Sequence, residues 1–120
     1  MCRSSAYTRS VSKQSMQEPT FLILTALAAG AQHGYGIMTD VARISDGRVR
    51  LRAGTLYAAL DRLKADGLVT SDKEEIVDGR LRRYYRITDE GTQQLAVEVR
   101  RLRANAAVAA HRLGLAGGPA

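Results

Sequence analysis

The chain first becomes almost continuously apolar between Phe21 and Ala29, in a segment that Glu18 and Pro19 precede and Gly30 follows. Proline suits the first turn of a helix, an acidic residue there complements the helix dipole, and glycine is a frequent stop signal. Apolar residues cover nearly the whole circumference of such a helix. We therefore predict a central core helix that begins near Glu18 and ends at Gly30.

A second helix is predicted to follow a turn at residues 33–36 and to end at an Asp-Gly pair, residues 46–47. Its apolar residues recur at helical spacing and predict one buried stripe. They are Ile37, Val41 and Ile44. Residues 48–52 then alternate arginine with Val49 and Leu51, which indicates either a short edge strand or an extended linker with its charges outward.

Residues 53–66 predict a third helix with two different faces, which Gly67 terminates. One face is apolar and suits docking on a small core. It carries Leu56, Ala59, Leu60 and Leu63. The opposite face carries Thr55, Ala58, Arg62 and, at its edge, Tyr57. Taken alone, this segment fits an ordinary surface helix as well as a helix that enters the major groove of DNA.

Two strands are predicted at residues 68–71 and 81–88. The acidic segment 72–78 between them is predicted to be a turn, and Asp78-Gly79 is a strong hairpin signal. Strand alternation places Leu81, Arg83, Tyr85 and Ile87 on one face and Arg82, Tyr84 and Arg86 on the other. Residues 80–86 contain four arginines and no acid, which makes them the most basic short window of the chain.

The last predicted helix starts at Thr88, an N-cap residue that two acids follow, and runs to about Leu113. Its apolar residues are spaced 4, 3, 4, 3, 4 and form a heptad seam. The seam comprises Leu95, Val99, Leu102, Ala106, Ala109 and Leu113. On a small domain this seam predicts packing against a second copy of the chain. The alternative is that the stripe folds back on the chain's own core.

Length and charge narrow the class of protein. A chain of 120 residues suits one small domain, and 18 Lys and Arg against 12 Asp and Glu give a formal net charge of +6. This balance favours a polyanionic partner, nucleic acid before a membrane surface. The single cysteine excludes an intramolecular disulfide, and with two histidines it forms no cluster at metal spacing. We therefore expect no metal and no cofactor.

The two ends of the chain differ in composition from the rest. Residues 1–17 are rich in serine and basic residues and are predicted to be a flexible basic arm, while residues 115–120 are predicted to be a disordered tail. The apolar run at 21–29 is too short to span a bilayer, and Glu18 and Pro19 separate it from the basic residues that a signal peptide would require. We therefore expect a cytoplasmic protein without membrane contact.

The predicted order of three helices, a basic hairpin and a long helix defines an α+β, mainly α, winged helix-turn-helix. The predicted division is an arm at 1–17, a DNA-binding head at 18–88, a dimerisation helix at 89–114 and a tail at 115–120. In such a fold the third helix enters the major groove, and the hairpin wing reaches the backbone or the minor groove.

Several short motifs in this order resemble the PadR family of bacterial transcriptional regulators. They are His33-Gly34-Tyr35-Gly36-Ile37, Gly54-Thr55-Leu56-Tyr57, Leu60 with Arg62-Leu63, Asp66-Gly67-Leu68, Arg83-Tyr84-Tyr85-Arg86-Ile87-Thr88 and Gly91. The resemblance extends from about Thr20 to Leu95. It implies a DNA-binding repressor that dimerises through its C-terminal helix, and the single C-terminal helix resembles the shorter subfamily.

The chain departs from that family pattern at three points. Arg52 stands where relatives often carry serine or a similar capping residue, and Ala58 stands where they often carry proline. There is no tryptophan, which argues against the binding of flat drugs between aromatic rings that some relatives show. Because an arginine is unfavourable at a helix N-terminus and cannot act as an N-cap acceptor, we expect Arg52 to contact a DNA phosphate.

The predicted DNA-contacting residues are Tyr35, Arg52, Thr55, Tyr57, Arg62, Lys64, Arg80, Arg82 and Arg83. Thr55 is assigned to base edges or phosphates, Arg80 to the minor groove at the wing tip, and the other cations to phosphates. Structural alternatives stay open: Tyr35 and Tyr57 as packing residues, and Arg62 and Lys64 as plain solvated charges. Tyr85 and His33 are expected to be packing or turn residues.

The predicted function is a sequence-specific transcriptional regulator, a repressor that binds a pseudo-palindromic operator in double-stranded DNA as a homodimer. The alternative is a winged-helix module for protein contacts, which would have an acidic partner and no specific DNA footprint. No nucleophile-base pair, carboxylate pair or phosphate loop supports an enzyme. A small-molecule effector of unknown identity, where one binds, is expected between the long helix and the head, near Tyr85, Leu95 and Val99.

Overall fold

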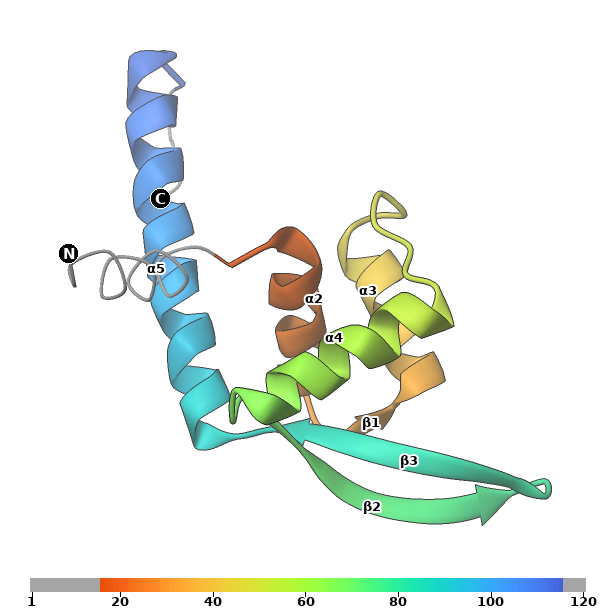
Figure 1. Cartoon of the computed structure of the whole chain (residues 1–120). Helices are drawn as coiled ribbons and strands as arrows, with labels where there is room; N and C mark the ends of the chain where they lie inside the picture. Colours follow the sequence, from red (N-terminus) through yellow and green to blue (C-terminus); the bar gives the residue numbers. More distant parts are fainter. Residues whose placement is uncertain (1–15, 116–120) are drawn as a thin grey trace, which may run out of the picture.

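The computed structural model describes residues 16–115 and shows a helical head from which one long helix projects (Figure 1). The elements in chain order are α2 (Glu18–Ala28), β1 (Gln32–His33), α3 (Gly34–Ile44), α4 (Ala53–Ala65), β2 (Val69–Val77), β3 (Arg80–Ile87) and α5 (Asp89–Arg112). The head is therefore a helix-turn-helix with a hairpin wing, as predicted. Almost all of the arm predicted at 1–17 and of the tail predicted at 115–120 lies outside the described residues.

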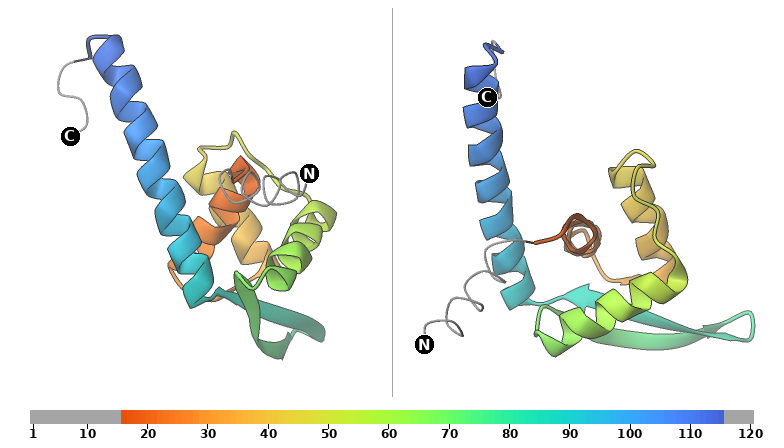
Figure 2. Two further views of the ribbon diagram at one scale, coloured as in Figure 1. Left: turned by 60° about the vertical axis from the view of Figure 1, so that its left-hand side comes forward. Right: turned by 45° about the horizontal axis from the view of Figure 1, so that its top comes forward.

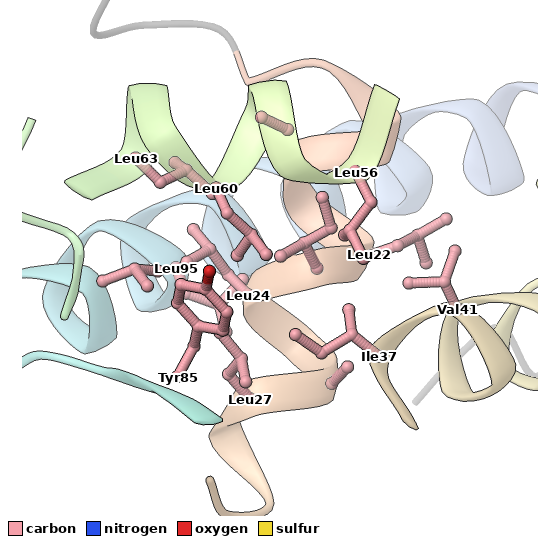
Figure 3. Packing of buried hydrophobic residues seen from close by; sticks show 14 residues of the cluster. Leu22, Leu24, Leu27, Ile37, Val41, Leu56, Leu60, Leu63, Tyr85 and Leu95 are labelled. Atoms are coloured by element: carbon pink, nitrogen blue, oxygen red, sulfur yellow. The ribbon is translucent and has the colours of Figure 1, made fainter. Parts of the chain in front are cut away.

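Helix α2 forms the centre of the head, as its apolar circumference predicts. Leu22, Ile23, Leu24, Ala26 and Leu27 are all buried. Helices α3 and α4 pack around α2 together with Tyr85 of β3 and Leu95 of α5 (Figure 3). The helix ends at Ala28 with Gly30 two residues beyond, which confirms the predicted boundaries.

The stripe predicted for α3 is right at two of its three positions. Ile37 and Val41 are fully buried, but Ile44 at the end of the helix is 42% exposed. Ser45 follows as the C-cap residue, and its hydroxyl donates to the Val41 carbonyl and accepts the backbone N–H of Val49 at 3.0 Å. The chain turns away there, so no neighbouring element covers Ile44.

The segment 48–52 is a linker and not a strand, so the second of the two predicted alternatives is correct. It has no regular backbone pairing, and Val49 and Leu51 pack against the core while the arginines point away from it. Ser45 is 2% exposed and bonds to both the N–H and the carbonyl of Val49, which holds the start of this linker against α3.

The sheet has three strands in the order β1-β3-β2, where the sequence predicted only two strands. Strand β1 pairs Gln32 with Tyr85 and His33 with Tyr84. It consists of two residues, too few for any alternation to show in the sequence. The free edge of β3 supplies the hydrogen-bond partners that make these two residues a strand.

The acidic segment 72–78 was wrongly predicted to be a turn. Strand β2 continues through it to Val77 and pairs with β3, with an irregularity between Ser71 and Glu74. Cross-strand attraction explains the difference, because Glu74 lies opposite Arg83 and the Asp72 carboxylate lies 3.5 Å from Arg86. Only Asp78 and Gly79 form the turn, both with positive φ, as the predicted two-residue hairpin requires.

Helix α5 begins and ends as predicted. The Thr88 hydroxyl caps it by accepting the Gly91 N–H at 3.0 Å, and the same hydroxyl donates to the Gly67 carbonyl at 2.7 Å, which ties the helix to the end of α4. Only the first half of α5 packs on the head, and the second half projects into solvent (Figures 1 and 2). Leu95, the first residue of the predicted seam, belongs to the core of its own head.

Candidate nucleic-acid interface

Helix α4 presents two faces as the sequence predicts. Leu56, Ala59, Leu60 and Leu63 are buried on the core, and Leu60 lies at the centre of the packing in Figure 3. Thr55, Arg62 and Lys64 are exposed on the remaining surface. This exposed surface also carries the Asp61 carboxylate, and Lys64 at its C-terminal end donates to the Ser71 hydroxyl of β2, so the N-terminal part of the surface is the part free to contact a ligand.

The N-terminus of α4 lacks a side-chain cap. Arg52 occupies the N-cap position, its side chain makes no capping hydrogen bond, and it is exposed. The first-turn N–H groups and the positive end of the helix dipole therefore have no side-chain acceptor, and the residue beside them is a cation. A phosphate placed there would be attracted by all three groups.

Tyr57 packs against the start of α3. Its ring lies over Gly34, where an added Cβ would collide with the Tyr57 hydroxyl, so the glycine of the His-Gly-Tyr-Gly motif is required by packing between α3 and α4. The ring is still 43% exposed. The packing alternative is therefore correct for Tyr57, and its DNA contact stays a prediction. Tyr35 is 71% exposed at the start of α3 and packs little.

His33 caps α3. Its Nδ1 accepts the Gly36 N–H at 3.2 Å, and its ring meets Tyr84 edge to face at 5.4 Å between centroids. Burial lowers the pKa of His33, the nearby Arg82 lowers it further, and Glu75 acts in the opposite direction. The neutral ring is therefore favoured in the folded state, as the N-cap requires.

We expect acid to weaken this cap. Because the pKa of His33 is lower in the folded chain than its ordinary value of about 6.5, the unfolded chain takes up the proton first. The stabilisation is therefore present above that value and is lost as the pH falls through the lowered pKa. Losing one N-cap costs about 1 kcal/mol.

Urea unfolding between pH 7.5 and pH 5.5 checks this expectation, with His33→Asn as the control. Asparagine caps a helix without titrating in this range. The wild-type chain should lose stability toward the lower pH, and the variant should lose clearly less. An equal loss in the two proteins would show that His33 is not the titrating group.

The wing is less basic than its arginines alone suggest. Residues 69–87 contain five basic and four acidic side chains. Arg83 bonds the Glu74 carboxylate at 3.0 Å, which raises the pKa of the arginine, and Arg86 pairs with Asp72. Arg83, which the sequence assigned to a phosphate, would have to leave or share Glu74 to make that contact.

The other basic side chains of the interface form no ion pairs within the described residues. Arg80 is exposed beside the turn, and among residues 16–115 it takes part in no ion pair. Arg82 lies opposite Glu75 and is half-buried, and Lys64 donates to the Ser71 hydroxyl at 3.1 Å. Sequence reasoning passed over Lys73, whose ammonium lies 5.0 Å from the centre of the Tyr84 ring on the wing.

The fold brings the wing and the start of α4 to the same end of the head. The hairpin runs beneath α4 and its tip extends past the N-terminal end of that helix (Figures 1 and 2). Tyr35 is the second residue of α3, which follows β1 directly, and so lies near the base of the wing. The predicted residues Arg52, Thr55 and Arg80 thus belong to one end of the molecule, opposite the end from which α5 projects.

The expected effector position near Tyr85, Leu95 and Val99 stays a prediction, and two of these residues, Tyr85 and Leu95, are buried in the core. An open recess of about 370 Å³ lies further along α5. Its walls come from the start of α2, the end of α3 and the middle of α5, and include Phe21, Leu22, Ile44, Arg48, Glu98 and Leu102. Glu98 is 4% exposed and bonds Arg101 through both carboxylate oxygens, a pair that the seam pattern did not indicate.

Three helices, a hairpin wing and a projecting C-terminal helix define a winged helix-turn-helix protein. The chain belongs to the transcriptional regulator PadR-like family, whose model matches residues 23–97. No helix within residues 16–115 is both long and apolar enough to cross a bilayer. In the same part of the chain, no cluster of His, Cys, Asp and Glu side chains is arranged to hold a metal ion.

Similar proteins agree with this membership. The chain is 40% identical over 80 residues to Transcriptional regulator Rv3488 of Mycobacterium tuberculosis, which is 67% of this chain and 71% of that protein. A PadR family transcription regulator of Clostridium difficile has a TM-score of 0.68 at 26% identity, over 81% of this chain and 99% of that one. Bacillus subtilis PadR, solved in complex with operator DNA, has a TM-score of 0.62 at 23% identity, over 69% and 47% of the two chains.

Proposed function

We propose that this chain is a cytoplasmic, sequence-specific DNA-binding repressor that acts as a homodimer on a pseudo-palindromic operator. The observation that carries the proposal is the exposed face of α4. Its N-terminal end has no side-chain cap and carries Arg52 and Thr55, and the wing lies beside it. Helix N-termini with exposed hydroxyl and cationic groups contact phosphates and base edges in helix-turn-helix proteins. The Bacillus subtilis relative that was solved with operator DNA supports the same use of the fold.

The side chains divide among base edges, the phosphate backbone and the minor groove. Thr55 and Tyr57 reach base edges or phosphates from the first turns of α4, and Tyr35 reaches a phosphate from the start of α3. The cations Arg52, Arg62, Lys64, Arg82 and Arg83 contact the backbone, and Arg80 contacts the minor groove. Arg83 does so by exchanging Glu74 for a phosphate, which costs little because an exposed ion pair contributes at most about 1 kcal/mol.

A salt series with the purified protein tests these assignments. Replacing Arg52 or Arg62 with alanine should weaken binding to every sequence alike and should reduce the slope of log K against log salt by about one unit per lost contact. Replacing Thr55 with alanine should instead leave the slope unchanged and lower discrimination between operator and altered operator by about tenfold. The measurement is fluorescence anisotropy with a duplex enriched from a random pool.

Two results would contradict the assignment. If the arginine and threonine variants behave alike, contacts to phosphates and to bases are not divided as proposed. If the wild-type chain enriches no sequence from the pool, the chain is better described as a winged-helix module for protein contacts.

Dimerisation is proposed to use the part of α5 that leaves the head. Leu102 and Leu113 are 40% and 72% exposed, and Ala106 and Ala109 between them are exposed as well. Leu102 also borders the apolar wall of the recess beside α2. The second half of a partner's α5 would cover both surfaces at once. Two heads joined in this way would meet half-sites one DNA turn apart, roughly 34–36 Å.

A repressor of this design would be released by a small molecule or another signal that changes the spacing of the two heads. The spacing depends on how the two α5 helices cross, since only the first half of each helix is packed on its own head (Figure 1).

A further inference from the structure

Two aliphatic side chains stand exposed near the tip of the wing. Ile76 of β2 is 73% exposed and Leu81 of β3 is 59% exposed. They lie directly opposite each other in the strand register, one residue pair before the Asp78-Gly79 turn. Directly opposed side chains share a face of the sheet, so the two residues form one small apolar surface.

This apolar surface is separate from the core of the head. Strand alternation puts Leu81 on the same face as buried Tyr85, but Arg83 and its partner Glu74 stand between them and bond each other at 3.0 Å. The ion pair between Arg83 and Glu74, whose side chains are both half-exposed, thus separates Ile76 and Leu81 from the core. Burial in the head therefore does not account for Ile76 and Leu81.

The surroundings of the pair favour DNA as the occupant. Arg80 is the next residue to Leu81 and is exposed, and it makes no ion pair within residues 16–115. The hairpin tip extends past the N-terminal end of α4 (Figure 2), and Arg52 and Thr55 belong to that end of the helix. Two side chains are far too small for a protein interface, which needs at least about 1,000 Å².

Aliphatic side chains flanked by cations are used by minor-groove proteins as wedges. Such a wedge enters between two base pairs, partly unstacks them and bends the duplex away from the protein, while the cations hold the neighbouring phosphates. The minor groove is about 6 Å wide, which admits the side chains at the end of one hairpin and not a helix.

We propose that Ile76 and Leu81 form an apolar wedge that enters the minor groove beside the α4 half-site and bends the DNA there. The inference rests on the proposed DNA-binding function and deepens it, because it adds a contact that is independent of charge. The wedge would also add sequence preference, since base-pair steps that unstack easily accept a wedge at a lower free-energy cost.

The test replaces both residues with threonine, which keeps the strand propensity and removes the apolar surface. The probe is a duplex enriched from a random pool by the wild-type protein, labelled at both ends so that energy transfer reports bending. The wild-type protein should bend this duplex. The I76T/L81T variant should bind about tenfold more weakly, bend it less, and keep the wild-type salt slope.

Two further variants make the outcome specific. The swap I76L/L81I keeps the apolar volume and should retain affinity and bending, which separates loss of the wedge from damage to the hairpin. Val97→Thr removes an aliphatic side chain of 51% exposure from α5, away from the wing, and should change neither. Circular dichroism confirms that each variant is folded.

The inference is overturned if I76T/L81T binds and bends the duplex as the wild-type protein does, and the proposed function then still stands. It is also overturned if I76T/L81T keeps its DNA behaviour but alters self-association in light scattering, because the pair then contacts another protein surface. If the wild-type protein enriches no duplex at all, the proposed function fails first.

Discussion

Replacing Ala106 with glutamate should convert the proposed dimer to a monomer and lower operator affinity by about 100-fold or more. Ala106 is exposed on the projecting half of α5, so the new carboxylate costs the isolated head nothing. In a symmetric dimer the same residue of each copy lies at the interface, and two unpaired carboxylates would be buried there together. A single head binds one half-site and loses the gain from linking two sites.

The matched control is Ala104→Glu. Ala104 lies in the same turn of α5, is also exposed, and falls outside the heptad seam. The two variants have the same charge and nearly the same helix propensity. Light scattering should show a monomer for Ala106→Glu and the wild-type mass for Ala104→Glu, and anisotropy should show the matching affinities. A dimer of unchanged affinity in Ala106→Glu would mean that the seam is not the interface.

Replacing Gly91 with alanine should lower the free energy of unfolding by about 1–3 kcal/mol. Gly91 lies in the first turn of α5, where an added Cβ would collide with the Leu68 carbonyl oxygen and approach the Ile87 side chain to 2.8 Å. The Leu68 carbonyl already accepts the Thr88 N–H at 3.0 Å, so it cannot move without loss of that bond. The junction between the head and α5 would have to open.

Gly54→Ala is the control for Gly91→Ala, because Gly54 also lies in the first turn of a helix but has open space where a Cβ would be. Alanine should there raise stability by up to about 1 kcal/mol. Urea unfolding of both variants measures the contrast, and a destabilised Gly54→Ala would show that the space is not free. If the α4 terminus approaches DNA closely, Gly54→Ala should also weaken operator binding despite its greater stability.

Local patterns predicted most of the secondary structure. The stripe from Leu56 to Leu63, the Thr88 cap and the Asp78-Gly79 turn each depend on neighbouring residues, whose spacing and chemistry are visible in the chain itself. The errors have one physical origin. β1 exists because β3 offers a free edge, and β2 continues through its acids because Arg83 lies opposite Glu74 and Arg86 pairs with Asp72. Partners distant along the chain decided both.

The same distinction applies to the candidate interface. The sequence by itself determined which helix is two-faced, that its N-cap is the unsuited Arg52, and that a heptad seam ends the chain, because periodicity and caps are properties of consecutive residues. Only the tertiary structure decided that Arg83 is engaged by Glu74, that Leu95 belongs to the head, and that Ile76 and Leu81 are left uncovered at the wing tip. Burial and ion pairing depend on which other elements pack against a residue, and the local sequence around that residue does not specify those elements.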